Sequence, residues 1–136
     1  MRDVLVDTNV ILRLFDTISA PDQTARAKQL FEAAKNGGVR LVIGPPVLFE
    51  VAWVLRSALK WSNGDTLDVL EAIIGWRGVK TLDKDYVKQA ISLGRETGIG
   101  FADSYLAITA IDCGLDVATF NERHFQKCGV DPFVME

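Results

Sequence analysis

Cysteine and histidine are scarce in this sequence, and their scarcity narrows the chemistry open to it. The 136 residues include two cysteines, Cys113 and Cys128, and one histidine, His124. The cysteines lack the spacing of a metal site or a redox motif, so they favour a reduced, cytoplasmic compartment over a secreted one. The histidine follows a turn, and we expect it in a surface or capping role. No Ser-His or Cys-His arrangement can be built around it, which argues against nucleophilic catalysis of those types.

Long apolar runs, a signal peptide and a phosphate-binding loop are also missing. Glu50 and Arg56 interrupt the longest apolar stretch, so no segment has the length of a transmembrane helix. The charge pair Arg2-Asp3 stands directly before a strand-like run, which is not a signal-peptide pattern. The segment 98–100, Gly-Ile-Gly, lacks the Lys-Ser or Lys-Thr pair of a phosphate loop. The formal net charge of −3 does not favour binding to nucleic acid by bulk charge alone.

What the sequence does have is the pattern of one globular α/β domain over residues 1–136. It is 49% hydrophobic and 24% charged, which is a globular balance. Short buried strands are expected at 4–6, 39–43, 79–82 and 115–118, with a weaker one at 130–134. Helical spacing of apolar residues fills most of the intervening segments. This alternation predicts a three-layer α/β/α sandwich with a mostly parallel central sheet.

Four acid or amide side chains are placed to meet at one edge of this sheet. Asp7 ends the first strand, and Glu50 lies early in the helix after the second. Asp103 begins the helix before the strand at 115–118, and Asn121 follows that strand. Ligands in parallel α/β folds bind beyond the carboxyl ends of the strands, so we expect the four to converge. Carboxylates at close quarters repel one another, and Mg²⁺ or Mn²⁺, which take oxygen ligands, would offset the repulsion.

Each of these side chains also has a structural interpretation that needs no site. Asp7 can cap the first helix, and Asp103 can be a first-turn acid that the helix dipole stabilises. Glu50 can lie on a solvated helix stripe, and Asn121 can be a turn residue. Trp53, close to Glu50 in the same helix, is expected in the core. The joint pattern of the four is more informative than any one of them.

The motifs that carry these residues resemble those of a known family. They are Val4–Val10 around Asp-Thr-Asn, Val47–Val51 around the Glu, Phe101–Ser104 with Ala-Asp-Ser, and Ala118–Asn121, followed by Phe125. In this order and at these distances they resemble the PIN-domain family, and more narrowly the VapC-type ribonuclease toxins of bacterial toxin–antitoxin pairs. The resemblance extends over nearly the whole chain and implies a PIN-like fold.

The resemblance also implies an activity and assigns roles to the residues. It implies a metal-dependent endoribonuclease that hydrolyses RNA phosphodiester bonds with Mg²⁺ or Mn²⁺. Asp7 and Asp103 would be direct metal ligands, Glu50 a ligand through water or an aligner of the attacking water, and Asn121 the group that orients a bound water or phosphate oxygen. Many relatives have Asp where this chain has Asn121, so the amide leaves open whether one or two metal ions bind. The side chains expected to fix the carboxylates are Thr8, Asn9, Ser104 and Thr119.

Partners and rival functions follow from the same resemblance. It implies an RNA substrate, a cognate antitoxin of a type II toxin–antitoxin pair, and a homodimer, with no membrane contact. Phosphate contacts are open to several arginines, none of which the sequence singles out: Arg13, Arg56, Arg95 and Arg123. The alternatives are a non-toxin PIN nuclease and a catalytically weak PIN-fold binding scaffold, for which Asn121 is the support. A phosphatase with an aspartyl nucleophile needs a second acid at Asn9, and a receiver domain needs an acidic pair after the first strand.

Overall fold

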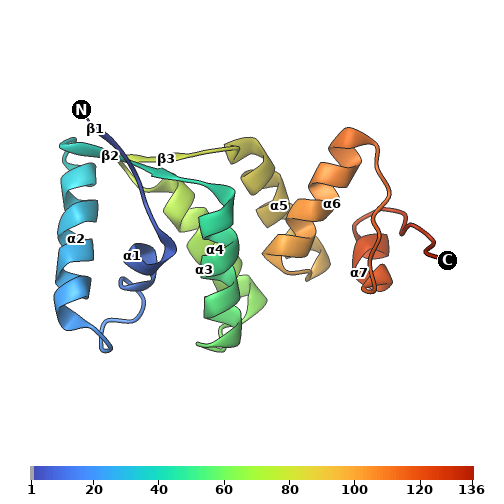
Figure 1. Cartoon of the computed structure of the whole chain (residues 1–136), viewed down its shortest axis with the longest axis horizontal. Helices are drawn as coiled ribbons and strands as arrows, with labels where there is room; N and C mark the ends of the chain where they lie inside the picture. The colour runs from blue at the N-terminus through green and yellow to red at the C-terminus, as the bar shows by residue number, and fades with distance from the viewer. Residues whose placement is uncertain (1) are drawn as a thin grey trace.

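The computed structural model describes residues 2–136 of the chain. In chain order the elements are β1 (Arg2–Leu5), α1 (Thr8–Leu12), α2 (Pro21–Lys35), β2 (Val39–Ile43), α3 (Pro45–Ser57), α4 (Asn63–Gly75), β3 (Val79–Thr81), α5 (Lys84–Thr97), α6 (Phe101–Cys113) and α7 (Glu122–Lys127). Figure 1 shows the strands at the upper left of the view, with α1 to α4 below them. Helices α5, α6 and α7 follow one another away from the sheet, so the two ends of the chain lie far apart.

The strands form one parallel sheet in the order β1-β2-β3. Val4 of β1 is in register with Leu41 of β2, and Leu41 is in register with Val79 of β3. Helices α1 and α2 connect the first pair of strands, and α3 and α4 connect the second. The predicted α/β fold with a parallel sheet is therefore confirmed. Because all three strands are parallel, their carboxyl ends lie at one edge, where β1 leads into α1 and β2 into α3.

The helices begin where the sequence provides a start signal. Proline occupies the first turn of both α2 and α3, where its missing N–H costs no hydrogen bond. Ser62 caps α4, because its hydroxyl accepts a hydrogen bond from the amide of Asp65 at 3.0 Å. Asp83 stands at the start of α5, but its backbone is left-handed and its side chain makes no cap bond. In the described range 2–136, no helix combines the length and the apolar character that a membrane span needs.

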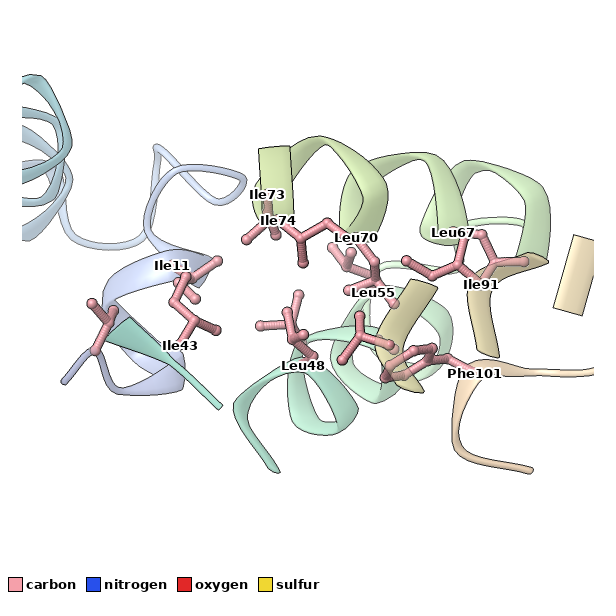
Figure 2. Close-up of a cluster of buried hydrophobic side chains, with 14 of the residues drawn as sticks. Ile11, Ile43, Leu48, Leu55, Leu67, Leu70, Ile73, Ile74, Ile91 and Phe101 are labelled. Atoms are coloured by element: carbon pink, nitrogen blue, oxygen red, sulfur yellow. The ribbon is translucent and has the colours of Figure 1, made fainter. Parts of the chain in front are cut away.

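The main core lies between the sheet and the helices that connect its strands. Figure 2 shows its centre, where Ile11 of α1, Ile43 of β2 and Leu48 of α3 meet the buried face of α4. Ile91 of α5 extends this core away from the sheet. A second, smaller cluster packs α6 against α7 and contains Ile99, Ala107, Ala110, Phe125, Cys128 and Val130. The two cores correspond to the two parts of the molecule on which the candidate site residues lie.

The expected strands at 115–118 and 130–134 are wrong. These segments form a single isolated parallel bridge between Val117 and Pro132, and they do not join the sheet. The amide of Val117 donates to the carbonyl of Asp131 at 3.2 Å, and the amide of Phe133 donates to the carbonyl of Val117 at 2.7 Å. Pro132 has no N–H to extend the ladder, and Leu115 is 59% exposed. Val130 is buried, but it packs in the smaller cluster with α6 and α7 and not against the sheet.

The expectation that Trp53 lies in the core is also wrong, because its side chain is 67% exposed. Helix α3 buries Leu48, Val51 and Leu55, which lie on one face at helical spacing. Trp53 is on the opposite face, three residues after Glu50, and both are exposed.

Candidate active site

Two of the predicted acids each accept a hydrogen bond from one residue, Thr8. Asp7 caps α1, and its Oδ1 accepts a hydrogen bond from the amide of Thr8 at 2.7 Å. The Thr8 side chain is buried, with 3% exposure, and its Oγ1 donates to Oε2 of Glu50 at 2.9 Å. Residues 42 positions apart in the chain are thus joined through α1. The capping interpretation of Asp7 and a role in a site are compatible, because the cap bond uses only Oδ1.

The buried residues next to Glu50 in α3 fix its backbone position. Its neighbours Val51 and Ala52 are buried, so the position of this turn of α3 is set by the core. The Glu50 side chain itself is exposed and is held by the Thr8 hydroxyl. A hydroxyl that donates to a carboxylate makes a stronger bond than one between neutral groups. Oε1 of Glu50 has no protein donor among residues 2–136 and is free to bind water.

The third predicted acid pairs with a residue to which we assigned no catalytic role. Asp103, in the first turn of α6, has its Oδ2 at 3.1 Å from Nδ1 of His124 in α7. Their side chains are 30% and 49% exposed, so the pair is open to solvent. The expected surface position of His124 is correct, but its partner was missed. The sequence carries no signal for this contact, because it depends on how α7 packs against α6.

The remaining predicted residues make local contacts. The amide of Asn121, at the start of α7, donates to Oγ1 of Thr119 at 2.9 Å. The buried Ser104 hydroxyl donates to the carbonyl of Ile99 at 3.4 Å rather than to a carboxylate. Asn9 is exposed and lines a pocket between α1 and α2. Of the side chains expected to fix the acids, Thr8 donates to two carboxylates, and its role in a catalytic site stays a prediction.

The structure arranges the site residues as two pairs rather than one cluster. Within residues 2–136, no group of three or more Asp, Glu, His or Cys side chains lies close enough to hold a metal ion. The link between the two parts is aromatic: the ring of Phe49, beside Glu50, is 5.3 Å from that of Phe101 and 4.9 Å from that of Tyr105. Segment 115–118 does not join the sheet, so the strand that was to bring α6 and Asn121 to the sheet edge is missing.

This arrangement does not fit a metal ion with the predicted ligand set. Asp7 and Glu50 provide carboxylate oxygens at one place, and Asp103 and His124 provide a carboxylate and an imidazole at another. We therefore derive no catalytic step through a metal. The assignment of the four residues as a catalytic set stays a prediction.

The structure separates the arginines that the sequence left equivalent. Arg95 of α5 binds Asp68 at 2.6 Å and Glu71 at 3.1 Å, and these hydrogen bonds raise its pKa, so its role is to tie α5 to α4. The Nη1 of Arg56 lies 3.5 Å from the carbonyl of Trp61. Arg13, in contrast, lies at the end of α1 and lines the same pocket as Asn9.

The parallel sheet, with Asp7 after its first strand and Glu50 after its second, defines an α/β protein with an acidic edge. The PIN domain family matches residues 4–130, and the chain belongs to this family. It is similar to a VapC ribonuclease of Aquifex aeolicus (strain VF5), with 26% identity over 133 residues, which covers 95% of this chain and 96% of that protein.

Two solved structures are also similar to the chain. One is the crystal structure of FitAcB from Neisseria gonorrhoeae, with 24% identity, coverage of 98% of this chain and 97% of that one, and a TM-score of 0.32. The other is the structure of FitAB bound to an IR36 DNA fragment, with 22% identity, coverage of 100% and 98%, and a TM-score of 0.35.

Proposed function

We propose that this chain is an endoribonuclease of the VapC type, the toxin of a type II toxin–antitoxin pair, which acts on RNA in the cytoplasm. Membership of the PIN domain family supports the proposal. So does the similarity to a protein named VapC ribonuclease, because that similarity extends over 95% of the chain. The remaining support comes from the side chains themselves.

The observation that carries the proposal is that Thr8 joins Asp7 and Glu50, because its amide donates to Asp7 and its hydroxyl donates to Glu50. The hydroxyl holds the Glu50 carboxylate against the start of α1 and leaves one carboxylate oxygen without a protein donor among residues 2–136. A carboxylate in this position can align a water molecule for attack on a phosphodiester and accept its proton. The carboxylates of Asp7 and Glu50 give this part of the surface a negative electrostatic potential. An RNA phosphate therefore needs a cation there in order to approach.

We extend the proposal to a requirement for Mg²⁺ or Mn²⁺. The four predicted residues do not lie together, so the support for this requirement is the donor chemistry of Asp7 and Glu50 alone. Both accept a hydrogen bond from Thr8 and offer carboxylate oxygens, the ligands that these hard cations prefer. In the same way we propose a cognate antitoxin and a homodimer as partners.

The test is cleavage of a labelled RNA by the purified chain, freed of any partner. We expect cleavage with Mg²⁺ or Mn²⁺ and none in excess EDTA. Asp103→Asn should abolish cleavage and leave the fold intact, because the change removes a charge from a solvent-open side chain. The matched control is Asp85→Asn, because Asp85 is an acid in the first turn of α5, as Asp103 is in α6, and Asp85 is exposed.

Two results would contradict this proposal. Undiminished cleavage in EDTA would exclude the metal requirement. Turnover by Asp103→Asn equal to that of Asp85→Asn would show that Asp103 is only a first-turn acid. A separate measurement addresses the partners: light scattering gives the mass of the free chain, and co-expression with the product of a short adjacent open reading frame should suppress cleavage.

A further inference from the structure

A pocket of about 420 Å³ lies between α1 and α2, and one of its lining residues, Asn9, directly follows Thr8, which contacts Glu50. Four polar side chains line it, Asn9 and Arg13 from α1 and Gln23 and Arg26 from α2, and its other walls are apolar. Both charged residues are arginines, in a chain whose net charge is −3. The pocket is thus locally basic.

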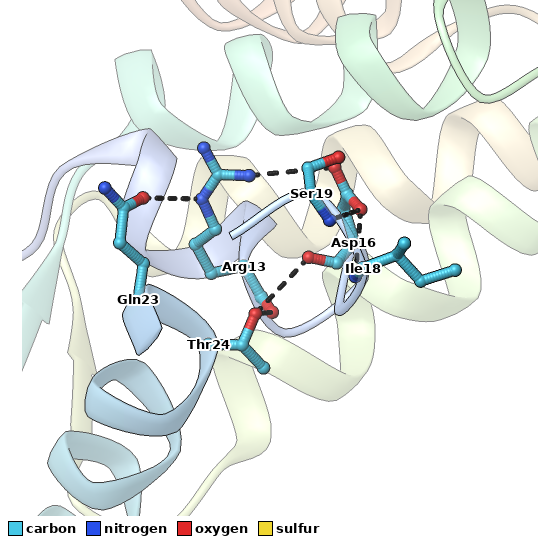
Figure 3. A network of polar contacts seen from close by, with 6 residues as sticks. All are labelled: Arg13, Asp16, Ile18, Ser19, Gln23 and Thr24. Carbon is cyan, nitrogen blue, oxygen red and sulfur yellow. Dashed lines mark hydrogen bonds and ion pairs between the residues drawn. The ribbon is translucent and has the colours of Figure 1, made fainter. Parts of the chain in front are cut away.

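Arg13 is held in a fixed orientation within this pocket. Figure 3 shows its Nε donating to Oε1 of Gln23 at 2.8 Å, with Nη1 at 3.6 Å from Oδ2 of Asp16. Asp16 is held in turn by the amide of Ser19 at 3.2 Å, and hydrogen bonds from Ser19 lower the pKa of its carboxyl. The Thr24 hydroxyl donates to the carbonyl of Arg13 at 3.0 Å and ties α1 to α2. A guanidinium fixed in this way loses little side-chain entropy when it binds an anion.

Arg26 provides the unpaired charge. It is exposed on α2 and forms no ion pair with any of residues 2–136. Asp22, one turn earlier on the same helix, lies at a spacing where a pair can form, but the two do not contact. Arg26 therefore has its donors free for an external anion.

Helix α1 connects this pocket to the candidate catalytic carboxylates. Thr8 contacts Glu50 of α3, and Asn9, the next residue, lines the pocket toward α2. Arg13 is five residues beyond Thr8, a helix rise of about 7.5 Å. A nucleic-acid strand that presents one phosphate to Glu50 can thus place a neighbouring phosphate in the pocket.

We propose that the pocket between α1 and α2 binds a backbone phosphate of the RNA, adjacent to the phosphodiester that is cut, through Arg13 and Arg26. This inference rests on the proposed ribonuclease function. Guanidinium groups bind phosphate oxygens with two parallel hydrogen bonds, and such contacts hold a strand in register without reading its sequence. The proposed ribonuclease function, together with the connection from Asn9 through Thr8 to Glu50, favours RNA over an acidic segment of a partner protein.

The test measures binding of a fluorescently labelled single-stranded RNA by anisotropy, in EDTA, over a range of salt concentrations. Arg26→Gln is the main variant, because it removes the charge and breaks no ion pair. Arg26→Lys restores the charge. Arg77→Gln is the matched control, since Arg77 is exposed, forms no ion pair in the described range, and changes the net charge equally.

We expect Arg26→Gln to weaken binding roughly three- to tenfold at low salt. It should also reduce the slope of log K against log salt by about 0.7, the value for one phosphate contact on a single strand. Arg26→Lys should keep the wild-type slope. Arg77→Gln should change both the affinity and the slope less than Arg26→Gln does. Melting curves of the variants establish that the fold is unchanged.

Failure of this inference and failure of the proposed function give different results. Equal effects of Arg26→Gln and Arg77→Gln, with wild-type RNA binding intact, would overturn the phosphate site alone. The phosphate site alone would also be overturned if Arg26→Gln weakened the binding of a poly-glutamate peptide but not of RNA. The pocket would then bind an acidic segment of a protein. A wild-type chain that neither binds nor cleaves RNA would overturn the proposed function and this site together.

Discussion

Because Thr8 and Glu50 share a hydrogen bond, substitutions at the two positions should have coupled effects on the free energy of unfolding. Thr8→Val keeps the branched shape of a side chain that is 3% exposed and removes the hydroxyl that donates to Glu50. A hydrogen bond to a charged group contributes roughly 1.5–3 kcal/mol. Glu50 is exposed, so water replaces part of the lost bond, and we expect a coupling of about 1 kcal/mol.

A double-mutant cycle isolates this coupling, because the single variant also gains a buried methyl group. The free energy of unfolding is measured in urea for the wild type, Thr8→Val, Glu50→Ala and the double variant. The matched control is Thr109→Val with Glu50→Ala, since the Thr109 hydroxyl donates to the carbonyl of Tyr105 within α6 and not to Glu50. That pair should be additive.

The same variant tests the functional role of the bond. If Glu50 aligns water, Thr8→Val should slow RNA cleavage, although by less than Glu50→Ala does, because the carboxylate remains but is no longer held. A coupling below about 0.3 kcal/mol, the scatter of additive pairs, would refute the reasoning. Unchanged cleavage by a variant that does show the coupling would refute the functional part only.

Two further predictions concern stability and thiol reactivity. Gly78 and Gly37 both have φ of +84°, but a Cβ at Gly78 would lie 2.3 Å from a backbone oxygen of α2, whereas nothing lies within 4 Å at Gly37. Gly37→Ala should therefore cost about 1 kcal/mol in urea unfolding, and Gly78→Ala at least about 2 kcal/mol more; equal losses would contradict this. Burial raises the pKa of the Cys128 thiol, and Cys113 is exposed. An aromatic disulfide reagent at pH 8 should label Cys113 first, and labelling of native Cys128 should accelerate as the pH rises toward its raised pKa; equal rates at pH 8 would contradict this.

Much of the fold was predictable because its signals are local. The starts of α2 and α3 follow from proline in the first turn, and β2 follows from a short apolar run that ends at Gly44. The prediction of a strand at 115–118 was wrong because that segment has no strong local signal. This four-residue segment contains Asp116 and has too few apolar residues to fix its partner, and Val117 pairs with Pro132 instead of the sheet.

The candidate site was predictable only in part. The bond from Thr8 to Glu50 agrees with the expected role of Thr8, because both residues follow strands that end at the same edge. The contact between Asp103 and His124 was not predictable, because it depends on how α7 packs against α6. The position of Trp53 was not predictable either. Its apolar neighbours indicated burial, but the packing of the surrounding helices determines which face of α3 is buried.

The sequence by itself determined the class of the molecule. Short apolar strands followed by Asp7 and Glu50 specify an α/β domain with acids beyond its sheet, because strand and helix periodicities are properties of neighbouring residues. The tertiary structure alone decided which polar groups meet. Arg13 and Arg26 line one pocket because α1 packs against α2, while Arg95 is occupied by two acids of α4. Contacts between distant segments depend on packing, which no local pattern encodes, and they determine which arginine is held by acids of another helix and which arginines line a pocket.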